Sequence, residues 1–349
     1  MKVKFGLGGL GSSDVQMGIK HAMLAEKSGF DGIWMADHIL GANLNSTWVE
    51  VWSVLAAIAV KTKRVRLYCG VTDPLRRHPA QTAQTLATLD RISNGRAGIA
   101  VGAGESMNLL PFGLDWRTEP LLRLREATEV IKMLLESSPA KPVKYKGKHF
   151  QLKDAFLQIE PVQKPRPPVF IGALGPKNRE LAGEIADGWC SWLQSLKTLK
   201  ESIEDIRRGA ERAGRNLEDF EIALNVPFAI SNDLEEAWKA IQDGVREELV
   251  LERRVLNSMG YTDPFKKELA IQWTLPSKES FNRLTEAKKL VPKEAIEAVS
   301  AIGDVETCIK KIEERVELGV NWIIVGNYGP NYERTLKIFQ KEIIPYFSE

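Results

Sequence analysis

The 349-residue sequence predicts an α/β protein, a (β/α)8 TIM barrel with a helical insertion between strands 7 and 8. Apolar, strand-like runs alternate with amphipathic helical segments along most of the chain, which gives about eight strands separated by helices. One charged, largely helical stretch of about seventy residues breaks this rhythm before the last strand. Barrels of this class often form one domain at this length, so we expect a single domain over residues 1–349.

An open, doubly wound sheet is the alternative architecture. Such sheets bind dinucleotides through a GxGxxG turn that leads from the first strand into a helix. The glycine-rich run at 6–11 has the sequence GLGGLG, but it lacks the right spacing into the helix that follows. The sequence therefore favours the closed barrel.

Residue spacing defines the elements of the first half. Ile19, Ala22 and Met23 share one face of the segment 15–28, as in an amphipathic helix. The segment 118–136 likewise places its Leu, Arg and Glu residues at helical spacing. In chain order we expect strand 2–8, helix 15–28, strand 32–36, helix 48–60, a strand within 65–74, helix 79–93, a strand within 95–108 and helix 118–136.

Proline and glycine mark the boundaries in the second half. A turn at Gly147 divides the stretch 143–159, which we expect to form a small β excursion. Pro176 stands in the first turn of a helix, where its missing N–H has no cost. The further elements are strand 169–172, helix 176–186, strand 188–192, helix 196–213, strand 220–230, the insertion 232–303, strand 320–326 and a helix to about residue 345.

The insertion 232–303 is the main departure from a regular barrel. Extra sequence of this length between barrel strands usually forms a lid or a subunit contact over the C-terminal ends of the strands. We therefore expect it near the barrel mouth.

Composition excludes several functional classes. The 48 basic and 46 acidic residues give a net charge of +2, which implies neither nucleic-acid nor membrane binding. The N-terminus enters a strand without a signal-peptide segment. Cys69, Cys190 and Cys308 form no CxxC pair and indicate buried thiols in a reducing, cytoplasmic compartment. The four histidines lack the spacing of metal ligands, so we expect no metal site.

Two candidate catalytic residues follow predicted strands directly. His38 can exchange a proton near neutral pH, and the neighbouring Asp37 carboxylate can fix its tautomer or favour its charged form. A histidine packed at a strand end, with Asp37 capping the next turn, is an equal alternative. Glu105 can act as a base, an orienting acceptor or a cofactor ligand, and its alternative is a helix N-cap favoured by the dipole.

A glycine-rich turn follows the strand 169–172. Free N–H groups at the start of the next helix, without bulky side chains, form an anion site, so the turn is a candidate phosphate cradle. Trp48, Trp189 and Trp192 could line an aromatic cofactor, although most tryptophans belong to the core. The turn consists of Gly172, Ala173, Leu174, Gly175 and Pro176.

Four motifs in this order resemble the bacterial-luciferase-like superfamily, and within it the branch that depends on coenzyme F420. They are Asp37-His38, Gly70-Val71-Thr72, the loop 102–108 (GAGESMN) and the segment 172–188 (GALGPKNRELAGEIADG). The segments 300–310 (SAIGDVETCIK) and 319–326 (GVNWIIVG) fit as well. The match runs from residue 2 to the end and is weakest over 232–292.

The resemblance implies a barrel that holds the deazaflavin F420 at the C-terminal ends of the strands, usually in a homodimer. The turn 172–176 would hold the cofactor phosphate, His38 and Glu105 would serve proton transfer and substrate orientation, and Trp48 would contact the substrate. A cis peptide is implied between Gly70 and Val71. The residues implied around the cofactor are Asp37, Gly70, Val71, Thr72, Gly104, Asn108, Gly172, Ala173, Leu174, Gly175 and Pro176.

We therefore expect an oxidoreductase that moves a hydride between F420 and a small organic substrate, resembling 5,10-methylenetetrahydromethanopterin reductase. Those reductases carry a glutamate near the end of the first strand, where this chain reads Phe5-Gly6-Leu7-Gly8-Gly9. An F420-dependent alcohol or sugar-phosphate dehydrogenase is therefore one alternative. The others are an FMN-dependent monooxygenase of the same superfamily and a non-catalytic barrel that binds cofactor. Expected partners are the small-molecule substrate and a second copy of the chain.

Overall fold

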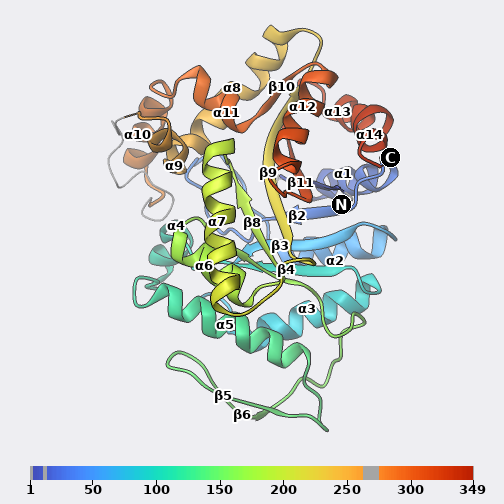
Figure 1. Ribbon diagram of the computed structural model, residues 1–349, viewed down its shortest axis with the longest axis vertical. Coiled ribbons are helices and arrows are strands. Elements are labelled where there is room, and N and C mark those ends of the chain that lie inside the picture. Colours follow the sequence, from blue (N-terminus) through green and yellow to red (C-terminus); the bar gives the residue numbers. More distant parts are fainter. Residues whose placement is uncertain (1–2, 11–13, 262–274, 349) are drawn as a thin grey trace.

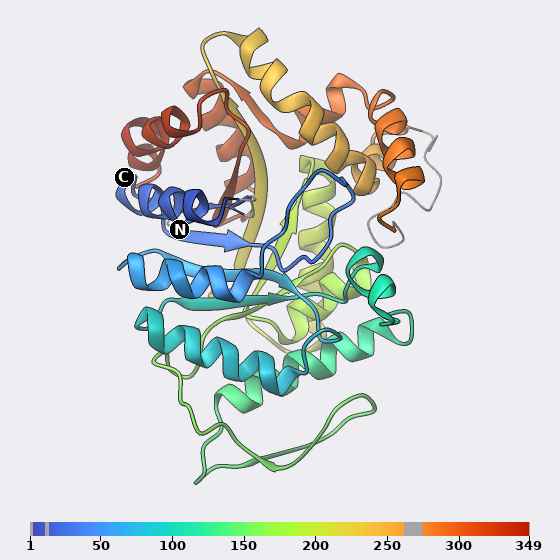
Figure 2. The ribbon, with the colours of Figure 1, turned by 180° about the vertical axis from the view of Figure 1, so that it is seen from behind.

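Eight parallel strands close into a barrel in the computed structural model, which describes residues 3–10, 14–261 and 275–348 (Figures 1 and 2). The hydrogen-bonded order is β11-β1-β2-β3-β4-β7-β8-β9, and β9 pairs with β11 to close the ring. The open-sheet alternative is therefore excluded. The barrel strands are β1 Lys4–Leu7, β2 Gly32–Met35, β3 Arg66–Thr72, β4 Ala97–Val101, β7 Val169–Gly172, β8 Gly188–Trp192, β9 Glu221–Ile230 and β11 Trp322–Asn327.

Helices cover the outside of the barrel (Figure 1). Ile33 and Leu67 point outward from their strands into the apolar layer beneath these helices, while Trp34 and Tyr68 point inward. The outer helices are α1 Val15–Lys27, α2 Val51–Lys61, α3 Pro79–Ser93, α5 Pro120–Leu135, α6 Pro176–Ile185, α7 Leu196–Arg212, α12 Val305–Val316 and α13 Tyr332–Ile338.

Aromatic side chains fill the barrel interior. The rings of Trp34 and Tyr68 stack with centroids 4.0 Å apart, and Phe170 and Trp322 pack edge-on against them. Gly98 lies opposite the Tyr68 ring, where any Cβ would collide with it. Because the interior is packed, a site for small molecules must lie at the rim, where the strands end.

The insertion between β9 and β11 is largely helical in its described part. Ala237, Ile241 and Val245 of α8 belong to a separate apolar cluster that also contains Met107 and Leu193, which follow β4 and β8. The insertion therefore packs over the ends of those strands. Its elements are α8 Leu234–Leu251, α9 Arg254–Ser258, α10 Lys278–Lys288, α11 Lys293–Val299 and the short strand β10 Ala301–Gly303; residues 262–274 of the predicted insertion lie outside the described residues.

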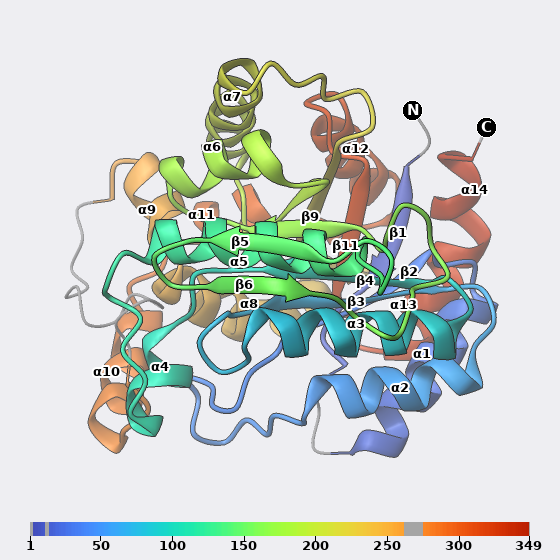
Figure 3. The ribbon, with the colours of Figure 1, turned by 90° about the horizontal axis from the view of Figure 1, so that it is seen from below.

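The predicted β excursion is an antiparallel hairpin of β5 Val143–Lys146 and β6 Gln151–Ala155. Figure 3 shows it lying across α5, on the outside of the molecule. The two chain ends lie close together in the same view, and the rings of Phe5 and Phe347 are 5.8 Å apart.

Several boundaries differ from the sequence prediction for local reasons. The helix expected over 48–60 begins at Val51, because the Glu50 side chain accepts from Ser53 N and caps it. The segment before Pro345 forms a π turn over Phe339–Ile343, and the single expected helix therefore ends in α14 Ile344–Tyr346. Helix α12 was not predicted. Strand 2–8 begins at Lys4, and residue 2 lies outside the described residues.

Candidate active site

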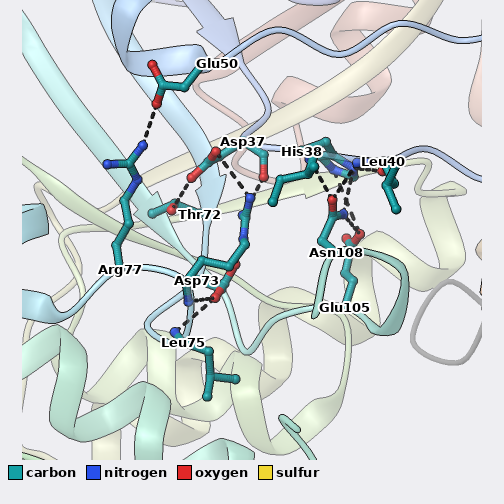
Figure 4. A network of polar contacts seen from close by, with 12 residues as sticks. Asp37, His38, Leu40, Glu50, Thr72, Asp73, Leu75, Arg77, Glu105 and Asn108 are labelled. Atoms are coloured by element: carbon teal, nitrogen blue, oxygen red, sulfur yellow. Dashed lines mark hydrogen bonds and ion pairs between the residues drawn. The ribbon is translucent and has the colours of Figure 1, made fainter. Parts of the chain in front are cut away.

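The loops that follow β2, β3 and β4 meet at one part of the barrel rim. Because parallel strands end on the same side, these loops converge even though their residues are far apart in sequence. Figure 4 shows the polar network that joins them, with Asp37 and His38 from the first loop, Asp73 from the second and Glu105 and Asn108 from the third. Thr72, the last residue of β3, belongs to the same network.

His38 lies between an aromatic ring and two polar side chains. Its imidazole stacks on Trp48, with ring centroids 4.4 Å apart. Nδ1 lies 3.1 Å from Asn108 Nδ2 and 3.4 Å from the Leu40 carbonyl oxygen. Nε2 lies 3.9 Å from a carboxylate oxygen of Glu105, whose side chain is 30% exposed. The two predicted catalytic residues and Trp48 therefore form one group, at a position that solvent reaches.

Glu105 precedes the short helix α4 Ser106–Leu109. It occupies the N-cap position, as the structural alternative expected, but its side chain makes no capping hydrogen bond. Its carboxylate lies instead 3.4 Å from Asn108 Nδ2. Glu105 therefore stands at the expected N-cap position, but its side chain does not make the expected capping hydrogen bond.

Asp37 faces away from the His38 ring. Its carboxylate accepts a 2.6 Å hydrogen bond from the Thr72 hydroxyl and pairs with the Arg76 guanidinium at 3.4 Å. Arg76 also donates to the Asp37 carbonyl oxygen and pairs with Asp73. The expectation that Asp37 acts on the imidazole is therefore wrong, because Arg76 and Thr72 hold its carboxylate.

Arg76 supplies positive charge to this buried cluster. Burial acts to lower the pKa of its guanidinium, but the carboxylates of Asp73 and Asp37 raise that pKa by more, so it lies above the usual value. Arg76 is therefore charged at every physiological pH, and it joins the loops after β2 and β3 through both acids.

Val71 lies near the end of strand β3, directly before Thr72. The peptide between Gly70 and Val71 is cis, as the family resemblance implied. The Val71 side chain packs between Gly102 and Gly172, where a Cβ on either glycine would lie within contact distance of its methyl groups. Gly172 thus makes room for Val71 and links the end of β3 to the turn after β7.

The turn after β7 is held from behind by two side chains. Trp189 Nε1 donates to the Ala173 carbonyl oxygen at 2.9 Å, and Arg179 donates to the Leu174 carbonyl oxygen. No side chain caps the first turn of α6, and a Cβ at Gly175 would meet no atom within 4 Å. The N–H groups at this helix start are therefore open to an anion.

The remaining predicted residues have distinct positions. Gly104 has a φ of +94°, a conformation that favours glycine, and precedes Glu105 in the loop. Trp189 is fully buried in the core, so the expectation that it lines a cofactor is wrong. Trp192 is partly buried against the apolar cluster of the insertion. Of the three tryptophans, Trp48 alone contacts His38.

Sequence reasoning missed two features of the mouth and one of the insertion. For Arg76, the only indication in the sequence was an acid, Asp73, three residues earlier. Asn225 lies inside the barrel mouth, with its amide near Gly8 and Gly326. Its signal was a lone amide in an otherwise apolar strand. Burial raises the pKa of Glu248 in α8 to about 7, against a hydrogen bond from Tyr328 that lowers it.

Within the described residues, no group of three His, Cys, Asp or Glu side chains is arranged to hold a metal ion. The same residues contain no helix with the length and apolar character of a membrane span. All three cysteines are buried free thiols.

Comparison with known proteins places these features in a family context. The family model described as luciferase-like monooxygenase matches residues 4–321. The chain is 33% identical to the 5,10-methylenetetrahydromethanopterin reductase of Methanopyrus kandleri, over 93% of both chains. A solved F420-dependent secondary alcohol dehydrogenase, in complex with an F420–acetone adduct, is 29% identical with a TM-score of 0.85 over 100% of both chains. The solved F420-dependent tetrahydromethanopterin reductase from Methanopyrus kandleri is 31% identical, with a TM-score of 0.84 over 99% of this chain and 100% of that one.

Proposed function

Because this chain belongs to the luciferase-like monooxygenase family, we propose that it is an oxidoreductase that transfers a hydride between coenzyme F420 and a small organic substrate. The relatives named above are F420-dependent enzymes and support the cofactor. The observation that carries the proposal is the composition of the rim. A histidine and a carboxylate lie on the loops after β2 and β4, and the uncapped start of α6 follows the neighbouring strand β7.

The turn 172–176 fits an anionic cofactor group. Its N–H groups begin a helix that no side chain caps, and the space over Gly175 is open. A phosphate bound there would gain hydrogen bonds and the favourable end of the helix dipole. We propose that this turn holds the F420 phosphate, and that Gly70, Val71, Thr72 and Gly104 line the cofactor ring.

The proposed chemistry divides between the cofactor and this chain's residues. F420, when bound, supplies the two-electron hydride chemistry. The accompanying proton needs a group that can hold it beside the reacting atom, and His38 with Glu105 is the pair on the rim with that capacity. Trp48 stacks on the imidazole and so restricts the ring to one orientation. Arg76 fixes the backbone at Asp37, directly before His38.

We propose a substrate of the kind that methylenetetrahydromethanopterin reductases use, with an alcohol or a sugar phosphate as the alternative. The alternative rests on the end of the first strand, where the resemblance implies a glutamate in the reductases and this chain reads Phe5-Gly6-Leu7-Gly8-Gly9. The polar side chain near Gly8 is the Asn225 amide of β9 rather than a carboxylate. A substrate screen over pterins, alcohols and sugar phosphates separates these classes.

The proposal includes a homodimer, which the family resemblance implies and which light scattering of the purified protein tests. It also includes a cytoplasmic location, supported by the three buried free thiols. Fractionation of cells that express the full-length chain tests the location.

Titration with F420 and with FMN tests the cofactor. We expect F420 to bind more tightly, and inorganic phosphate to compete with it. Gly175→Leu should weaken F420 binding at least about tenfold, because its side chain would cover the N–H groups at the start of α6. Gly175→Ala is the matched control, since its Cβ meets no atom within 4 Å. Equal affinity for FMN would overturn the F420 assignment, in favour of the monooxygenase alternative.

A further inference from the structure

The orientation of the Asn108 amide follows from two backbone contacts. Its Oδ1 accepts hydrogen bonds from Ile39 N at 2.7 Å and from Leu40 N at 3.0 Å. Only the oxygen of an amide can accept from N–H donors, so these two bonds fix which end of the side chain is which. Asn108 is 3% exposed, so water does not compete for these positions. Nδ2 must therefore face His38 and Glu105.

This orientation determines what His38 Nδ1 can do. Nδ2 lies 3.1 Å from Nδ1 and carries two hydrogens, so Nδ1 must offer a lone pair to accept one of them. A hydrogen on Nδ1 would point at the hydrogens of Nδ2. The Leu40 carbonyl oxygen, which could accept such a hydrogen, is more distant at 3.4 Å. The shorter contact therefore favours a bare Nδ1.

A neutral imidazole with a bare Nδ1 carries its hydrogen on Nε2. Nε2 is the ring nitrogen nearer to Glu105, at 3.9 Å from its carboxylate. The Asp37 carboxylate, the other acid near the loop, is held by Thr72 and Arg76 and does not contribute. Because one face of the imidazole stacks on Trp48, His38 makes its polar contacts through the nitrogen atoms at the ring edge.

We propose that Asn108 is a positioning residue that selects the Nε2–H tautomer of neutral His38. The ring then presents an N–H donor, rather than a lone pair, toward Glu105. This role deepens the proposed function, on which its relevance to catalysis rests, and replaces the expectation that Asn108 lines the cofactor ring. In this form the ring holds its hydrogen on Nε2, where it can be donated to an electronegative substrate atom, and Glu105 is the neighbouring group that can accept a proton.

Asn108→Asp tests the proposal with almost no change of shape. One carboxylate oxygen can still accept from Ile39 N and Leu40 N, so the loop keeps both bonds. The other oxygen replaces the amide donor with an acceptor, so Nδ1 should take the hydrogen and Nε2 should become bare. In a Ser-His-Asp triad a variant that imposes the wrong tautomer lowers kcat by about 10⁴-fold. Here we expect kcat to fall by about 10²-fold or more, with a smaller change in KM.

Nitrogen-15 NMR of histidine-labelled protein reads the tautomer directly, at about pH 9, where ordinary histidines are neutral. The His38 signals are identified by their loss in His38→Gln. We expect a protonated Nε2 in the wild type and a protonated Nδ1 in Asn108→Asp. A protonated Nδ1 in the wild type, or the same tautomer in both proteins, would overturn the proposal.

Glu105→Gln provides the second variant and tests the rival cause. If the Glu105 carboxylate selected the tautomer by attracting Nε2–H, this variant would lose the preference, whereas our proposal expects it to remain. Loss of the preference in Glu105→Gln would therefore also overturn the proposal. The spectra require neither F420 nor substrate. A confirmed tautomer together with absent F420 turnover would contradict the proposed function and leave this inference intact.

Discussion

The loops after β2, β3 and β4 hold their shape through side chains, whereas the turn after β7 presents mainly backbone. In the first region Arg76 joins two buried acids, and Asn108 joins His38 to Glu105. In the second, Trp189 and Arg179 only support carbonyl groups from behind. The two regions therefore tolerate different substitutions. The first region depends on the identity of each side chain, and the second depends on the absence of side chains.

The largest expected effect lies in the first region. His38→Ala should lower turnover by roughly 10²–10⁴-fold, the usual size of an acid–base contribution, while F420 affinity stays near the wild-type value. Single-turnover oxidation of reduced F420 measures the rate, and a separate titration measures the affinity. His21→Ala, on α1 and stacked on Tyr332, is the control histidine. A wild-type rate in His38→Ala would leave Glu105 or a residue of the insertion as the proton-transfer group.

The Arg76 cluster should show the next largest effect, this time on stability. Arg76→Met would leave Asp37 and Asp73 buried without their cation, and we expect a loss of about 3–5 kcal/mol in the free energy of unfolding. Arg77→Met is the matched control. Arg77 pairs with Glu50, whose side chain is 47% exposed, so its loss should cost less than about 1 kcal/mol. Urea unfolding of both variants checks the contrast, and equal losses would contradict it.

Two alanine substitutions sharpen the comparison within the turn after β7. Gly172→Ala would push a Cβ against Val71, and we expect a destabilisation of about 1–3 kcal/mol. Gly175→Ala adds a Cβ in open space and should change stability by no more than about 0.5 kcal/mol. Thermal or urea unfolding measures both. If the two variants were equally stable, the close packing of Gly172 on Val71 would not contribute to the free energy of unfolding.

These contrasts explain what the sequence could predict. Strands β7 and β8 and helix α3 have the predicted boundaries, because a proline or a glycine stands at an end of each element. The positions of His38 and Glu105 at the rim also followed from strand order alone. The local sequence pattern is therefore sufficient to predict where a residue lies when its position depends only on where a strand ends.

The directions of polar side chains could not be predicted in the same way. Asp37 turns toward Arg76 because a buried carboxylate needs a cation and donors, and that partner is 39 residues away in the chain. Asn108 turns toward His38 because two backbone N–H groups of another loop fix its oxygen. Neither contact leaves a periodic signal in the sequence. The helix α12 was missed although the sequence carries a local signal for its start, since the Asp304 side chain accepts from Thr307 N and caps it.

A half-buried acid outside both regions offers the smallest and last test. Glu248 in α8 accepts from the Tyr328 hydroxyl, and within the described residues no cation like Arg76 pairs with it. Burial, with a smaller contribution from the nearby Glu247, raises its pKa from 4.5 to about 7, against the hydrogen bond from Tyr328. The folded state therefore binds this proton more tightly than the unfolded state.

The sign of the pH effect follows from linkage. A raised carboxyl pKa contributes full stability below the unfolded value, and that stability is lost as pH rises through about 7. The shift corresponds to at most about 3 kcal/mol, and because the side chain retains some solvent contact we expect about 1–2 kcal/mol. Glu248→Gln should thus unfold at the same urea concentration at pH 5 and pH 8, after subtraction of the changes shared with Glu297→Gln, an exposed control on α11. Parallel wild-type and Glu248→Gln curves over this range would show that the Glu248 carboxyl titrates like an exposed acid.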